Sequence, residues 1–276
     1  MANHRKVSSR RLMTDGLLLA LLVVPIARGH AQTKPPLTKK SSSTASIVDV
    51  PVRSFVVKDA SVAGALFKLR SSDVSHVVVG FEKLPHKEGN NEEGGPISLK
   101  LTDTTIGDVV KRLCQADPRY EYKVITGQMI SPKLSGSMIE VRPKGAAKDP
   151  NDLLNMEIRH YHIDKNMGAG GAIEGINEDA KELREFLYRK TVEWSKKTGI
   201  WPGSPGSIMS GNMPPPRFTL DLRDVTVRQI LDAISLKSIQ RFKEGKNYGP
   251  VGWEYDFVIK PNASTGLGGI PNWKPF

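Results

Sequence analysis

The chain has almost no cysteine, since Cys114 is the only one among its 276 residues. An intrachain disulfide is therefore excluded in any redox compartment. Cys114 follows Leu113 on an expected helix, where it can pack as a small apolar side chain. A cysteine nucleophile needs a partner histidine, and the sequence assigns none. We expect Cys114 to be structural.

Long hydrophobic runs are also missing. The run from Leu17 to Ile26 is interrupted by Pro25 and is too short to cross a bilayer, which takes about 20 residues. Four basic residues precede this run, and small residues ending at Ala31 follow it. That order is typical of a secretory signal. We predict a signal peptide over 1–31, export to the periplasm or cell exterior of a bacterium by the Sec or twin-arginine route, and no integral membrane segment after cleavage.

Several chemical motifs are absent. The sequence has no Gly-rich phosphate loop after a strand, no nucleophile elbow and no zinc-protease helix. The formal net charge is +11, and loss of residues 1–31 leaves about +7, with basic residues scattered among acidic ones. A scattered charge on an exported chain does not favour nucleic-acid binding. We expect no catalytic residue, no cofactor and no nucleic-acid partner.

The chain does contain one short sequence motif in three copies. Each copy is a strand with alternating apolar residues, then an Asp, then a hydroxyl residue two positions later, then an amphipathic helical stripe. We predict that the hydroxyl residues are helix N-caps and that each Asp serves the same helix start by complementing its dipole and free N–H groups. The copies span residues 55–62, 99–106 and 220–227, with Asp59, Asp103 and Asp224 and with Ser61, Thr105 and Thr226.

These units predict an α+β fold of two small modules, each with a sheet that carries its helices on one face. Residues 32–47 are rich in Lys, Ser and Thr and predict a flexible linker. The residues between Gly168 and Gly175 predict a flexible break. The expected order is a first module over 48–143, a linker over 144–151, a second, diverged module over 152–261 with an inserted helix over 177–197 and a Pro/Gly-rich loop over 199–216, and a loose tail over 262–276.

Residues 50–142 resemble the secretin and TonB short N-terminal domain and the related periplasmic N-domains of secretins. The resemblance rests on the strand, cap and helix of 55–69 and of 97–113, closed by strands at 120–125 and 138–142; residues 152–260 resemble a diverged further copy. It implies an envelope protein that uses small α+β modules for contact with other proteins. Because no pore domain or receptor barrel follows, we expect neither a secretion pore nor a receptor. The expected function is non-enzymatic protein–protein interaction or assembly with envelope proteins.

The loop over 199–216 is a candidate partner-binding segment. It is dense in Pro and Gly, and long loops of this kind are commonly functional or disordered. Its apolar side chains either dock a partner or pack on their own domain; they are Trp201, Ile208, Met209 and Met213.

Two alternative functions rest on other residues. Trp253 and Tyr255 alternate on an expected strand and could stack on sugars, which would make the chain a cell-wall polysaccharide binder. His160 and His162 are two apart on another strand, so their rings share one face, and paired histidines ligate zinc in some enzymes. That pair would support a zinc-dependent envelope hydrolase, although the sequence nominates no third ligand.

Overall fold

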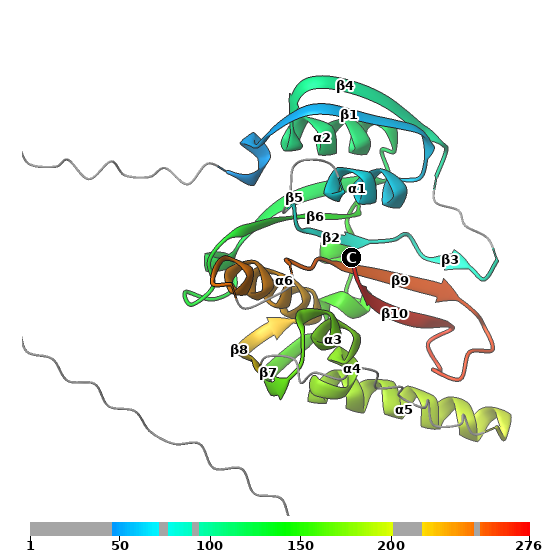
Figure 1. The fold of residues 1–276 in the computed structure, drawn as a ribbon. Coiled ribbons are helices and arrows are strands. Elements are labelled where there is room, and N and C mark those ends of the chain that lie inside the picture. The colour runs from blue at the N-terminus through cyan, green and yellow to red at the C-terminus, as the bar shows by residue number, and fades with distance from the viewer. Residues whose placement is uncertain (1–45, 72–76, 90–93, 201–216, 246–248) are drawn as a thin grey trace, which may run out of the picture. The chain divides into compact units, whose positions relative to one another are not determined.

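In the computed structural model, all three copies of the repeated motif form a strand followed directly by a helix (Figure 1). The structure describes residues 46–71, 77–89, 94–200, 217–245 and 249–276. Alternation in each strand buries one face, and each helix buries its apolar stripe. The fold is α+β, as predicted. The three pairs are β1 (Pro51–Ala60) with α1 (Val62–Arg70), β4 (Ile97–Thr105) with α2 (Ile106–Ala116), and β8 (Arg217–Thr226) with α6 (Val227–Lys243).

The predicted caps are confirmed at all three helix starts. The side-chain oxygen of Ser61 accepts a hydrogen bond from the Gly64 amide at 3.1 Å. Thr105 caps α2 in the same way. Thr226 forms a full capping box, because the Gln229 side chain also accepts from the Thr226 amide at 2.8 Å. Such a cap contributes about 1 kcal/mol to helix stability.

The three Asp residues do something other than the predicted helix capping. Asp59, Asp103 and Asp224 have φ of 50°, 45° and 52°, and they are the only non-glycine residues of the described chain in the left-handed region. Asp tolerates this backbone better than most residues because its short side chain bonds locally. Each Asp therefore places a left-handed kink within the last three residues of its strand, and the hydroxyl residue two positions later caps the helix.

The strands form two ribbons and one central sheet. β1 pairs antiparallel with β4, and β7 (Glu157–Asn166) pairs antiparallel with β8. The central sheet has the order β10-β9-β2-β6-β5, and β3 (His86–Lys87) pairs beside it with β9. Its other strands are β2 (Val79–Glu82), β5 (Tyr120–Thr126), β6 (Ser137–Pro143), β9 (Trp253–Ile259) and β10 (Gly269–Pro275).

Helices separate each ribbon from the central sheet (Figure 1). α1 and α2 lie between the β1–β4 ribbon and one face of the sheet, where Phe55, Leu66 and Phe81 belong to one core. α6 lies between the β7–β8 ribbon and the opposite face, in a second core that includes Trp253. The sheet is therefore covered by helices on both faces, and its inner strands β2 and β6 are buried on both sides.

The expected division into two modules with separate sheets is not what the structure has. β9, from the second half of the chain, pairs in parallel with β2 from the first half, so the two halves share the central sheet. The Trp253 ring lies directly against Gly80, where an added Cβ would come within 2.5 Å of it.

The expected tail contains β10, which pairs with β9 along its whole length, and the side chain of Phe276 is buried beside Phe81. Residues 46–276, as far as they are described, belong to one compact unit.

Three segments differ locally from the prediction. The expected flexible break is helical, as α3 (Ala169–Glu174), and this helix packs against β10. The expected single inserted helix is divided at Ala180 into α4 (Ile176–Asp179) and α5 (Lys181–Thr198). The expected linker over 144–151 holds a short 3-10 helix, η3 (Ala146–Lys148); the other 3-10 turns are η1 (Ile47–Asp49), η2 (Gly127–Met129) and η4 (Leu153–Asn155).

No helix within the described part of the chain is both long enough and apolar enough to span a bilayer.

Candidate functional site

A cavity of about 560 Å³ lies where the two halves of the chain meet. Its floor is formed by β9 and by the ends of β2 and β6, and its walls come from α5 and from the segment that connects the halves. The volume is within the range of ordinary ligand pockets, which are mostly apolar with a few polar groups. The apolar lining includes Leu153, Phe186, Tyr255, Phe257, Ile259 and Leu267.

The polar end of the cavity leads into a buried ionic cluster. Arg228, on the first turn of α6, is 5 % exposed and binds three carboxyl groups. Its Nη1 lies 2.7 Å from Glu82 and 2.8 Å from Glu140, and its Nη2 lies 2.7 Å from Asp152. Arg142 donates to the same Glu140 at 3.0 Å. Glu82 and Asp152 line the cavity, so the cluster is in contact with whatever occupies it.

The cluster holds more acid than base. Arg228 and Arg142 are shared among four carboxyl groups, namely Glu82, Glu140, Asp152 and Glu121. Burial raises the pKa of Glu82 to about 8, against the opposing effect of Arg228. Burial also raises the pKa of Asp152. Because the pKa of Glu82 lies above 7, the cluster retains a proton at neutral pH.

Two further groups belong to this cluster. Asp232 is buried, accepts a 2.8 Å hydrogen bond from the Trp253 indole N–H, and has a pKa held far above its ordinary value by burial and by Glu140. Tyr255 has a raised pKa because it is buried near Asp152 and Glu82. The lysine nearest this end, Lys83, lies 3.1 Å from Glu254.

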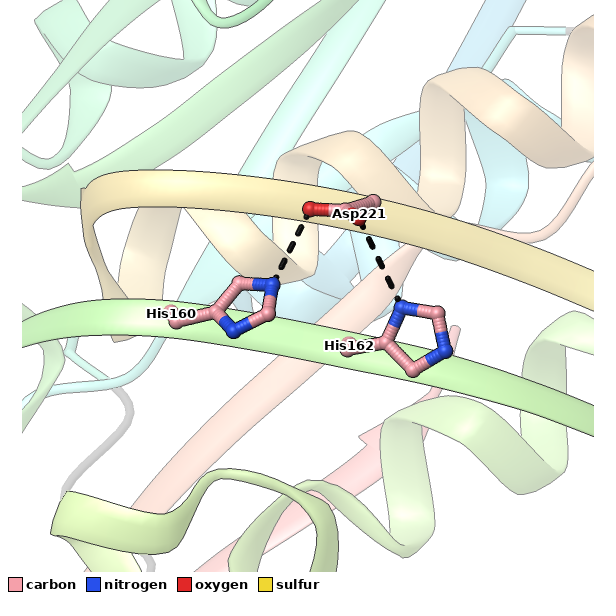
Figure 2. A group of neighbouring side chains, drawn as sticks. All are labelled: His160, His162 and Asp221. Carbon is pink, nitrogen blue, oxygen red and sulfur yellow. Dashed lines mark hydrogen bonds and ion pairs between the residues drawn. The ribbon is translucent and has the colours of Figure 1, made fainter.

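A second group of side chains lies on the outer face of the β7–β8 ribbon. His160 and His162 share one face of β7, as predicted, and Asp221 of β8 lies between their rings (Figure 2). His160 Nε2 is 3.1 Å from Asp221 Oδ1, and His162 Nδ1 is 3.6 Å from Asp221 Oδ2. All three side chains are about half exposed. Asp221 offers the third donor group that the sequence did not nominate.

The expected stacking pair does not form an exposed platform. Trp253 is fully buried and its indole bonds Asp232, so it presents no ring face to a ligand. Tyr255 is 4 % exposed, and its ring lies 5.7 Å from that of Trp273. Only Tyr255 lines the cavity. The reason is that the sheet face carrying both rings is covered by α6 and its core, whereas a stacking platform needs an open sheet face.

The expected partner-binding residues Trp201, Ile208, Met209 and Met213 lie outside the described residues. Cys114 is half-buried, and burial raises the pKa of its thiol to about 11.

Sequence reasoning missed the ionic cluster. Asp152 lies 76 positions from Arg228 in the sequence, and Glu82 lies 146 positions from it. No local spacing in the sequence therefore connects these residues. The available signal was a charged residue inside an apolar pattern, as at Glu140 between Ile139 and Val141.

No protein-family model, curated protein or solved structure significantly matches this chain.

Proposed function

We propose that this chain is an exported, non-enzymatic binding protein of the bacterial cell envelope that captures a polypeptide partner. The apolar N-terminal run supports export, and the resemblance to secretin and TonB N-terminal modules supports a role in protein contact. The observation that carries the proposal is the cavity between the two halves, with a buried acid-rich cluster at its polar end.

The cavity favours a partner segment with an apolar body and a positive charge. Phe186, Tyr255 and Phe257 supply aromatic surface, which attracts cations as well as apolar groups. Glu82 and Asp152 share the guanidinium of Arg228, and the raised pKa of Glu82 keeps a proton on that carboxyl at neutral pH. A lysine or arginine side chain that reached Glu82 would replace that proton, because a nearby positive charge favours the ionised carboxylate.

Peptides of matched shape and different charge test the proposal by calorimetric titration of the mature chain. The probes are Phe-Lys-Phe, Phe-norleucine-Phe and Phe-Glu-Phe, each acetylated and amidated at its ends. We expect the lysine peptide to bind at least tenfold more tightly than the norleucine peptide, a difference of about 1.4 kcal/mol. Glu82→Gln should abolish that preference, since an amide cannot ionise.

Glu88→Gln is the matched control, because Glu88 is an exposed acid whose partner is Lys260. That variant should keep the preference for the lysine peptide. Equal affinity for the three peptides, or no binding of any of them at millimolar concentration, contradicts the proposal. Binding of soluble peptidoglycan fragments in place of the peptides supports the alternative of a cell-wall polysaccharide binder.

A further inference from the structure

The β7–β8 ribbon brings together a set of donors that suits a transition metal. In the antiparallel register His162 lies directly opposite Asp221, and His160 is two residues along the same strand. Because side chains alternate along a strand, all three project from one face. Figure 2 shows both rings directed at the same carboxylate. The fold alone therefore places two imidazoles and one carboxylate together.

The donor atoms lie close enough together to be drawn onto one metal ion by rotation of their exposed side chains; the two contacts to Asp221 go to its two different oxygens. A zinc ion with bonds of about 2.0–2.2 Å holds neighbouring tetrahedral donors roughly 3.3 Å apart. The two contacts to Asp221 measure 3.1 Å and 3.6 Å, and donor atoms of the three residues all lie within 4.8 Å of one another. Closing this set around one ion requires the exposed side chains to rotate.

We propose that His160, His162 and Asp221 bind one zinc ion on the surface of the ribbon. Two imidazole nitrogens and one carboxylate oxygen match the ligand types that zinc takes, and three protein ligands leave a fourth position open. The exposure of all three side chains directs that position to solvent. The ion would link β7 to β8, and the open position is available to water or to a donor from another molecule.

This site is separate from the cavity, since none of its three residues lines that cavity. The zinc site and the cavity proposal can therefore fail independently.

Titration of the metal-free mature chain with zinc alone, in a buffer that does not coordinate metal, tests the site. We expect saturation at one zinc per chain and a melting temperature that rises with zinc concentration, because a ligand that binds the folded state stabilises it. His160→Ala, His162→Ala and Asp221→Asn should each weaken binding at least tenfold, since even the outer partners of metal ligands contribute tenfold or more.

His86→Ala is the matched control. His86 Nδ1 lies 3.3 Å from Asp256 Oδ1, and among the described residues no third donor joins this pair. The control should bind zinc as the unaltered chain does. The metal-free melting temperatures of the three site variants should match that of the unaltered chain, which separates loss of a ligand from loss of fold. Absence of saturable zinc binding, or binding that survives all three site substitutions, overturns the proposal.

Discussion

The raised pKa of Glu82 makes a quantitative prediction about stability and pH. Glu82 is 5 % exposed, and burial raises its pKa from an ordinary value of 4.5 to about 8. In this interval the folded chain holds a proton that the unfolded chain has released. The free energy of unfolding therefore falls as pH rises from 4.5 to 8. Each pKa unit corresponds to about 1.36 kcal/mol, so the loss due to Glu82 is on the order of 4 kcal/mol.

Glu82→Gln removes this titration while preserving the contacts of the neutral acid. The amide oxygen can still accept from Arg228, as the carboxyl oxygen of Glu82 does. We expect the variant and the unaltered chain to have similar unfolding free energies near pH 5. Near pH 8.5 the variant should be more stable by about 4 kcal/mol. Subtracting the two curves cancels the contributions of Asp152 and Asp232 to the extent that they titrate alike in both proteins.

Urea unfolding followed by tryptophan fluorescence, between pH 5 and pH 8.5, measures both curves. Urea is preferred to guanidinium because it adds no ions that would screen the cluster. Glu88→Gln provides the control and should track the unaltered chain at every pH. Parallel curves for the chain and its Glu82→Gln variant would refute the protonation of Glu82 and the excess of acid in the cluster.

Three further predictions concern other parts of the fold. Arg228→Met should cost about 3–5 kcal/mol in urea unfolding because it leaves buried carboxyls unpaired, and the loss should be greater at pH 8 than at pH 5; an equal loss at both would count against the cluster. Asp224, with φ of 52°, should tolerate Gly with little change in melting temperature, whereas Asp224→Val should cost about 1–2 kcal/mol; equal effects would contradict the left-handed turn. The pKa of Cys114, about 11, should slow alkylation by iodoacetamide at pH 8 in the folded chain by about two orders of magnitude relative to the chain in urea.

The strand–helix units could be predicted from sequence because every determinant is local. Apolar alternation, an N-capping hydroxyl and a helical stripe lie within about fifteen residues at each of 55–69, 99–113 and 220–234. The left-handed Asp residues lie inside the same sequence motif, yet the motif alone does not distinguish a residue with a left-handed backbone from a helix-capping residue. The positive φ of each Asp in the structure makes that distinction.

The central sheet could not be predicted because the local residue pattern does not show which distant strands pair with each other. Val79 and Trp253 begin strands that lie side by side in the sheet although they are far apart in sequence. The same holds for the candidate sites. The histidine pair follows from spacing on one strand, whereas Asp221 joins it only through the register of β7 with β8. The cluster around Arg228 depends on how α6 packs against β2, against β6 and against the segment that holds Asp152.

Photo-crosslinking from inside the cavity tests the central claim most directly. A benzoylphenylalanine in place of Leu267, which lines the cavity, is activated in the producing cells, and the adducts are identified by mass spectrometry. The account predicts an adduct with a polypeptide segment that carries Lys or Arg beside an apolar residue, and predicts its loss when Glu82→Gln is added. The same probe at Ile270, exposed and outside the cavity lining, should not yield that adduct. Adducts with carbohydrate, with segments lacking a basic residue, or in equal yield from both positions would contradict the account.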